Sequence, residues 1–249
     1  MKFVSIIFLF INLVHISISS AEVRRLQSID QVIKKFQNLT LKFKRDQNHR
    51  LIFASTYLDS TIEINNEIEN NAFVYPHWVE SIVVDFANLY INALHNYEQS
   101  QRVALSWKEA FKINDQKYYK LSVQLLMAMN AHIYHDLPIA LMQSFDKGYL
   151  PEQVEDDFYK MNETFEKLTP KFMALLYEFE KLLGVNKKGI KEWVVFNAVK
   201  SMRSDAWELG VELYNTSSVN RFYLLNKIDI DAFDNAEIIR KGRFFIPSH

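Results

Sequence analysis

Apolar residues recur along most of the chain at steps of three and four, the spacing that places them on one face of a helix. The strongest pattern begins at Tyr75-Pro76, where proline suits the first turn of a helix, and continues to Tyr97. For the first helix a strand is the alternative, since the positions from Leu39 to Phe43 alternate. The helices that we expect lie at residues 28–45, 51–68, 76–97, around 107–111, 115–135, 138–148, 151–168, 170–183 and 190–214, followed by two short helices and a docked tail.

Capping residues predict where some of these helices begin or end. Asn114 and Asp115 belong to the residue types that cap helix N-termini, so we expect a long helix to begin there. Thr169-Pro170 combines a capping residue with a first-turn proline, and Gly184 is typical of a helix end. These two signals predict a separate helix at residues 170–183.

Pro138 interrupts a helical pattern, since proline lacks the backbone N–H and its ring collides with the preceding turn. Either the helix kinks, or it ends near His135 and Asp136 caps a new helix that carries Pro138 in its first turn. Glycine and proline number only five each, which favours long helices over a turn-rich β fold. We therefore predict an all-α, single-domain multi-helix bundle with a kinked or broken helix at Pro138.

The first 21 residues have the pattern of a secretory signal. A positive charge at Lys2 precedes a run of about 12 apolar residues, and the small residues Ser19 and Ala21 precede an expected cut after Ala21. The run is short for a membrane span, although an uncleaved amphipathic anchor is the alternative. We expect a secreted or periplasmic chain, residues 22–249, with no stable membrane span after cleavage.

Cysteine is absent from the sequence, which excludes disulfides, thiolate metal ligands and a cysteine nucleophile. The predicted signal contains one of the 29 basic residues and none of the 30 acidic residues, so the mature chain has a net charge of −2. Because there is no basic surplus, we expect no nucleic acid among its partners. The sequence also lacks a Gly-rich phosphate loop, a Gly-x-Ser-x-Gly elbow and a His-Glu-x-x-His motif, which argues against the enzyme classes that use them.

The stretch from Asn130 to Pro138 gathers polar side chains inside an apolar run, where burying them is costly unless they bind each other, a metal or a ligand. His132 and Asp136 are four residues apart and therefore share a helix face. Such a pair suits a divalent metal such as zinc or iron, or a base polarised by a carboxylate. The structural alternative is that Asp136 caps a helix and His132 is a hydrogen-bonded core residue. We expect His135 to be solvated or to bond a neighbouring helix.

Two other helices carry candidates for the same site. Asp85 and Asn88 lie three residues apart on the strongest helical pattern, where a buried carboxylate needs a partner. If this helix packs against the polar stretch, Asp85 would ligate a shared metal or orient His132; an ordinary buried ion pair is the alternative. Arg203 would neutralise Asp85 or Asp136, or would anchor an anionic substrate group, with a surface or local helix pair as the alternative.

The segment Met129 to Pro138 resembles the core motif of an uncharacterised, mostly bacterial domain-of-unknown-function family, Met-Asn-Ala-His-Ile-x-x-Asp-Leu-Pro. Softer similarity lies at Phe86 to Tyr90, at Tyr57 and at Arg203 to Trp207, so that the resemblance covers roughly residues 50–215. It implies an all-helical fold but no particular activity or substrate. The site residues that it implies are Asn88, Asn130, His132, Asp136 and Arg203.

The sequence supports two main hypotheses for function. The first is an enzyme in which His132 and Asp136 bind a metal or form a base–carboxylate pair, Asp85 assists, and a small, partly apolar molecule undergoes hydrolysis or proton transfer. The residues expected to bind its substrate are Asn88, Asn130 and Arg203. The second is a non-catalytic protein whose many aromatic residues enclose a small molecule or lipid. A third interpretation is that the polar residues form a purely structural network.

Overall fold

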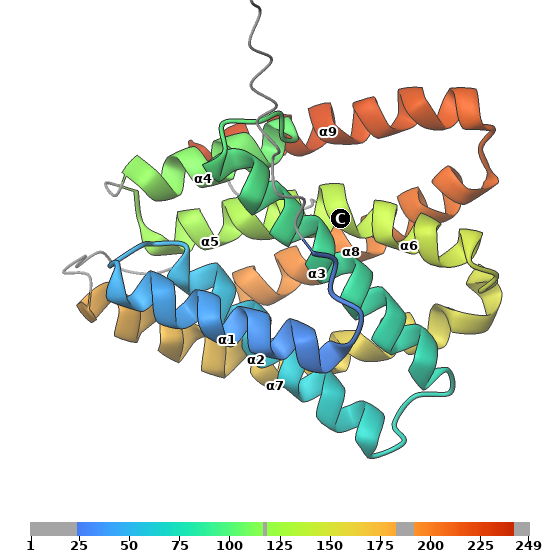
Figure 1. Ribbon diagram of the computed structural model, residues 1–249, viewed down its shortest axis with the longest axis horizontal. Helices are drawn as coiled ribbons and strands as arrows, with labels where there is room; N and C mark the ends of the chain where they lie inside the picture. Colours follow the sequence, from blue (N-terminus) through green and yellow to red (C-terminus); the bar gives the residue numbers. More distant parts are fainter. Residues whose placement is uncertain (1–23, 117–118, 183–191, 242–249) are drawn as a thin grey trace, which may run out of the picture.

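In the computed structural model, the residues described are 24–116, 119–182 and 192–241, and every regular element among them is a helix (Figure 1). The predicted all-α bundle is therefore confirmed. The elements in chain order are α1 (Ile29–Arg45), α2 (Leu51–Glu69), α3 (Pro76–Glu98), α4 (Leu105–Gln116), α5 (Leu121–Met129), η1 (Asn130–Asp136), α6 (Leu137–Asp146), α7 (Pro151–Leu182), α8 (Glu192–Asn215) and α9 (Ser218–Arg240).

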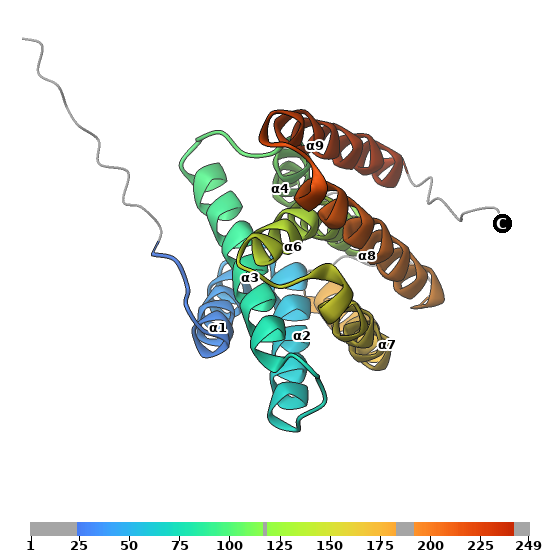
Figure 2. The ribbon, with the colours of Figure 1, turned by 90° about the vertical axis from the view of Figure 1, so that its right-hand side faces the viewer.

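The three elements α5, η1 and α6 follow one another directly and form a central helix. All nine residues of α5 are buried, and η1 contacts α3, α4, α8 and α9 in addition to its two continuations. Figure 2 shows α6 near the middle of the view, with α3 and α8 on either side. The polar stretch that the sequence singles out is thus surrounded by other helices, which is where unpaired polar groups are most costly.

The element η1 is a π-helix, in which backbone hydrogen bonds span five residues and the turn is wider than in an α-helix. The N–H of Leu137 donates to the carbonyl of His132, and Pro138 lies in the first turn of α6. In a regular α-helix the proline ring would collide with the carbonyl of Tyr134. Because Asp136 makes no capping hydrogen bond, the helix neither stops nor restarts there. It passes through the π-helix into α6.

Gly210 allows α8 to lie close to α6. A Cβ atom at this position would be 2.8 Å from the Cβ of Leu141, closer than two carbon atoms approach without repulsion. The close approach also brings α8 against η1. Arg203, about two turns earlier on α8, is thereby carried toward the polar stretch.

Asn114 and Asp115 lie in the last turn of α4 and do not begin a helix, contrary to the prediction. Their side chains are engaged elsewhere: Asn114 Nδ2 donates to the carbonyl of Ala110 at 2.6 Å, and Asp115 accepts from Arg50 at 2.6 Å. Residue type alone indicated a cap, but α4 continues through both residues, and their side chains make these contacts instead.

The helix α7 is continuous, so the predicted separate helices at residues 151–168 and 170–183 are wrong. Pro170 lies inside it, at a cost of about 3 kcal/mol for the missing bond and the steric conflict. Buried apolar residues on both sides of the proline, including Leu168 and Phe172, offset that cost by packing. The C-terminal region differs in the same way: α9 is one helix where two short ones were predicted.

Three predictions lie outside the described residues: the signal at residues 1–21, the stop at Gly184, and the docked tail after residue 241. Among the described residues, we found no helix that combines the length and the apolar character needed to cross a membrane.

Candidate functional site

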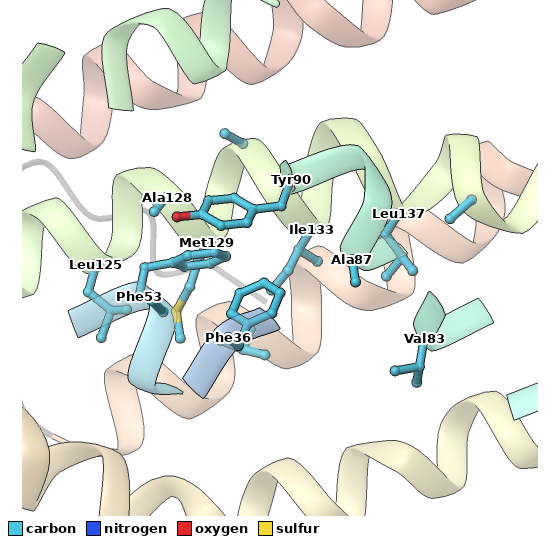
Figure 3. Packing of buried hydrophobic residues seen from close by; sticks show 14 of the residues in the cluster. Phe36, Phe53, Val83, Ala87, Tyr90, Leu125, Ala128, Met129, Ile133 and Leu137 are labelled. Atoms are coloured by element: carbon cyan, nitrogen blue, oxygen red, sulfur yellow. The ribbon is translucent and has the colours of Figure 1, made fainter. Parts of the chain in front are cut away.

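A partly open cavity of about 90 Å³ is lined by side chains from α2, α3, α5, η1, α6, α7 and α8. Its walls are mainly apolar and aromatic. Figure 3 shows wall residues within the core, among them Phe53 from α2, Val83 from α3, Met129 from α5, Ile133 from η1 and Leu137 from α6. His132 and Arg203 also line this cavity. The structure therefore brings two of the predicted site residues to one cavity, although they are far apart in the sequence.

His132 and Asp136 bind each other at the edge of this space. The distance from His132 Nδ1 to Asp136 Oδ2 is 3.0 Å, and both residues are 2% exposed. The same carboxylate accepts a hydrogen bond from Trp107 Nε1 at 2.8 Å through Oδ2, and it bonds His135 Nδ1 at 2.7 Å through Oδ1. Three donors on two elements, η1 and α4, thus hold Asp136 in one position.

The three ionisable groups on η1 shift one another's pKa values. Burial by itself would raise the pKa of Asp136, but the hydrogen bonds from His132 and His135 lower it below its usual value. Burial lowers the pKa of His132 by more than Asp136 raises it. For His135 the balance is reversed: Asp136 and Asp229 overcome the effect of burial and raise its pKa. The arrangement favours an ionised Asp136, a charged His135 and a neutral His132.

The protonation of Asp136 decides which nitrogen of His132 is basic. An ionised carboxylate only accepts hydrogen bonds, so Nδ1 carries the proton and Nε2 carries the lone pair. Nε2 is buried and has no hydrogen-bond partner among the described residues. Phe86 stacks on the imidazole with ring centroids 3.4 Å apart and an interplanar angle of 6°, and Tyr57 meets it edge-on. A fixed, unpartnered basic nitrogen at a cavity wall has the geometry of a general base.

Arg203 reaches the cavity from α8 and is 3% exposed. Its Nε donates to Asn162 Oδ1 at 2.7 Å, and its Nη2 donates to the carbonyl of Phe158 at 3.3 Å. The rings of Phe158 and Phe165 lie 4.5 and 4.7 Å from the guanidinium carbon. Burial lowers the pKa of Arg203 to about 9, which still leaves it charged at neutral pH. The predicted pairing with a site carboxylate is not formed among the described residues.

Asp85 does not orient His132, and the predicted contact between them is corrected by the structure. Its carboxylate pairs with Arg25 at 2.6 Å and with Lys147, and Asp85 does not line the cavity. The neighbouring residue, Phe86, faces His132 instead. Successive helix residues point about 100° apart, so only one of the two can face the imidazole.

Asn88 and Asn130 hold backbone segments and do not line the cavity. Asn88 Oδ1 accepts from the N–H of Leu26 at 2.8 Å, and its Nδ2 donates to the carbonyl of Leu26 at 3.0 Å. Asn130 Nδ2 donates to the carbonyl of Ala232 at 2.7 Å and so joins η1 to α9. Both atoms of the Asn88 amide thus have structural partners, whereas Asn130 Oδ1 is buried without a partner among the described residues.

Two contacts of the site differ from what the sequence indicated. His135 bonds Asp136 directly, which was not predicted; it also pairs with Asp229 on α9 at 4.0 Å, in agreement with the predicted contact to a neighbouring helix. The two oxygens of the carboxylate let Asp136 meet His132 and His135 on different sides. Trp107 was not identified as a site residue. A buried indole N–H needs an acceptor, but only the packing of α4 on η1 shows which one it uses.

The predicted metal pair is not arranged as two ligands, because Asp136 Oδ2 is bonded to Nδ1 of His132. Within the ranges that the structure describes, no group of three or more His, Cys, Asp or Glu residues is placed to hold a metal ion. The contact has the geometry of a base with its orienting carboxylate, the other arrangement that the sequence left open.

The fold and the site together define an all-α protein with a buried histidine–aspartate pair at the wall of an apolar cavity. The chain belongs to the DUF5995 family, described as a family of unknown function, whose profile matches residues 29–242. The match confirms the predicted resemblance to an uncharacterised family and extends beyond residues 50–215 at both ends. Comparison with curated proteins and with solved structures gave no match.

Proposed function

We propose that this protein is an enzyme that hydrolyses a small, partly apolar molecule, or moves a proton on it, in the cavity beside His132. One observation carries the proposal: Nε2 of His132 is buried, basic and without a partner among the described residues, while Nδ1 is held by Asp136. An acceptor left unsatisfied in an apolar interior destabilises the fold. Such an arrangement is typical of a site that receives a ligand proton.

The proposed reaction begins when Nε2 of His132 takes a proton from the bound molecule or from a water beside it. The imidazole becomes positively charged, and Asp136 stabilises this charge through its hydrogen bond to Nδ1. Trp107 and His135 keep the carboxylate in place during the transfer. Because burial lowers the pKa of His132, the imidazolium returns the proton readily in the next step.

A non-catalytic small-molecule or lipid-binding protein is the second candidate. The walls of the cavity are mostly aromatic and aliphatic, which is typical of sites that enclose apolar ligands. In this version the histidine would accept a hydrogen bond from the ligand without taking its proton. A zinc or iron site at His132 and Asp136 is a third version, which requires the two side chains to turn from each other toward the metal.

The test compares purified wild type with His132→Gln and Asp136→Asn. Short-chain p-nitrophenyl esters report hydrolysis, and small ketones in heavy water report proton exchange. We expect both substitutions to lower turnover by about 10²- to 10⁴-fold, while circular dichroism remains helical. His77→Gln is the matched control, because His77 lies in the first turn of α3 and does not line the cavity.

Turnover that is unchanged in both site variants would overturn the proposal. The non-catalytic binding protein would be favoured if wild type and His132→Gln both yield an unmodified small molecule and neither shows turnover. Metal content measured on protein purified without chelators tests the metal version, which predicts near-stoichiometric zinc or iron that is lost in Asp136→Asn.

A further inference from the structure

Arg203 is a buried cation without a buried anion. The described residues contain no carboxylate within ion-pair distance of its guanidinium, and its partners are the side-chain oxygen of Asn162, the carbonyl of Phe158 and two aromatic rings. A guanidinium has five N–H donors, and the described residues accept from only two of its nitrogens. A buried charge is stable only when it is compensated, so this arrangement favours an anion that comes from outside.

The other polar groups that line the cavity are already satisfied. The hydroxyls of Thr56, Ser60, Thr61 and Thr169 each donate to the carbonyl four residues earlier in their own helix, at 2.8 to 2.9 Å. Such back-bonding leaves a hydroxyl little capacity to donate to a ligand. Of the lining residues, Arg203 therefore offers free donors, and His132 Nε2 offers a free acceptor.

We propose that the cavity binds a small monoanionic carboxylate, with its carboxylate on Arg203 and a short apolar body against the aromatic walls. The planar fork of a guanidinium matches the two oxygens of a carboxylate. A single negative charge balances the single positive charge of Arg203, whereas a doubly charged phosphate would leave an uncompensated charge among apolar walls. This inference shares the cavity of the proposed function and names its ligand class, but it does not require catalysis.

The volume of the cavity limits the size of the ligand. At about 90 Å³ it is smaller than the engineered cavity of roughly 150 Å³ that accepts benzene in another protein. The cavity is partly open, and its size suits a carboxylate with a body of only a few carbon atoms. A longer acyl chain exceeds this volume and must displace wall side chains or extend through the opening, so we expect affinity to fall as the chain lengthens.

The experiment measures binding of butyrate and of its neutral isostere butyramide to the mature chain by isothermal titration calorimetry. We expect butyrate to bind at least about tenfold more tightly than butyramide, and octanoate to bind more weakly than butyrate. Arg203→Met replaces the charge with an apolar chain of similar length, a change that buried ion sites often tolerate. We expect this variant to lose the preference for butyrate over butyramide. Arg45→Met is the control, since the Arg45 side chain is 75% exposed.

Equal affinity for butyrate and butyramide in wild type would overturn the inference, and this comparison holds even if Arg203→Met fails to fold. An unchanged preference in Arg203→Met would overturn it as well. The variant His132→Gln separates the two proposals. If it still prefers butyrate over butyramide and its turnover is unchanged, the proposed enzyme is contradicted and the carboxylate site is supported. Lost preference in Arg203→Met, with turnover that depends on His132, supports both.

Discussion

His132 and His135 lie three residues apart on η1, yet their pKa values move in opposite directions. His132 is enclosed by aromatic rings and has one carboxylate partner, so the cost of burying its charge prevails. His135 is 14% exposed at its side chain, touches Asp136 and faces Asp229, with its Nε2 4.0 Å from that carboxylate. Two anions and partial contact with water are enough to favour its charged form.

This difference predicts how stability depends on pH. The pKa of His135 is raised on folding, so its contribution to stability is fully present below the unfolded value of about 6.5 and is lost as the pH rises through the folded value. We expect His135→Gln to lower the free energy of unfolding most at about pH 6, and progressively less toward pH 9. Urea denaturation at a series of pH values measures this difference.

The control for this series is Gln143→Ala, an uncharged change on the neighbouring helix α6, for which the difference from wild type does not vary with pH. A deficit in His135→Gln that stays constant or grows as the pH rises would contradict the assigned charge state of His135.

At the scale of elements, the π-helix carries the polar cluster. On η1, His132 and His135 bond different oxygens of Asp136, and a turn of η1 holds more residues than an α-helical turn. The same wide turn accommodates Pro138. The proline that interrupts the sequence pattern and the polar cluster before it are therefore parts of one local arrangement.

The helix α7 shows an unfavourable local residue that packing overrides. Pro170 is exposed and inside the helix, so replacing it by alanine removes no buried contact and restores one backbone donor. We expect Pro170→Ala to raise the free energy of unfolding by about 2 kcal/mol. Removing the proline stabilises the helix, and the greater conformational entropy of the unfolded chain offsets part of this gain. Chemical denaturation measures the change, with Glu178→Ala on the exposed face of α7 as the control.

A lower stability of Pro170→Ala would show that α7 needs a bend at this position to pack on α2 and α8. An unchanged stability in Glu178→Ala, within about 0.5 kcal/mol, would establish that the exposed face itself contributes little.

At the scale of the whole molecule, the segment before α1 is fastened to α3. Asn88 binds both backbone groups of Leu26, and Asp85 pairs with Arg25 and with Lys147, which directly follows α6. The two residues that the sequence assigned to a site therefore join the N-terminal segment to the centre of the bundle. Buried polar side chains on an apolar helix require partners, and for Asp85 and Asn88 these partners belong to the protein itself and not to a ligand.

We expect Asn88→Ala to lower the free energy of unfolding by about 2–3 kcal/mol, because two partly buried hydrogen bonds to Leu26 and one buried hydrogen bond to the carbonyl of Val84 are lost. The N–H of Leu26 should then exchange faster with solvent. The measurement uses the mature chain. We propose that this chain is exported and begins at Glu22, and the mass of the protein recovered outside the producing cells tests this proposal.

Asn226→Ala is the matched control for this prediction, since Asn226 is exposed and bonds only its own helix. If Asn88→Ala has unchanged stability but has lost turnover, the structural role is contradicted and the predicted substrate-binding role of Asn88 is supported.

The sequence by itself determined the helices and the spacing of the central pair. Helical periodicity is a property of neighbouring residues, so α1, α2, α3 and α8 begin and end close to their predicted bounds. The interval of four residues between His132 and Asp136 likewise places their side chains on the same face of a helix. Where local signals conflicted with packing, as at Asn114 and Pro170, the sequence-based prediction failed, because capping and proline effects are smaller than the burial of a helix face.

Only the tertiary structure decided what the polar residues do. Trp107, Asp229 and Phe86 reach η1 from three other helices, and no spacing in the sequence relates them to it. Trp107 holds the carboxylate of Asp136, Asp229 helps to raise the pKa of His135, and Phe86 stacks on the His132 ring. The separation of Arg203 from every described carboxylate, and the cavity that it shares with His132, also depend on how distant helices pack. Charge states, desolvation and the cavity arise from groups that packing brings together in space, which is why the spacing of residues in the sequence could not predict them.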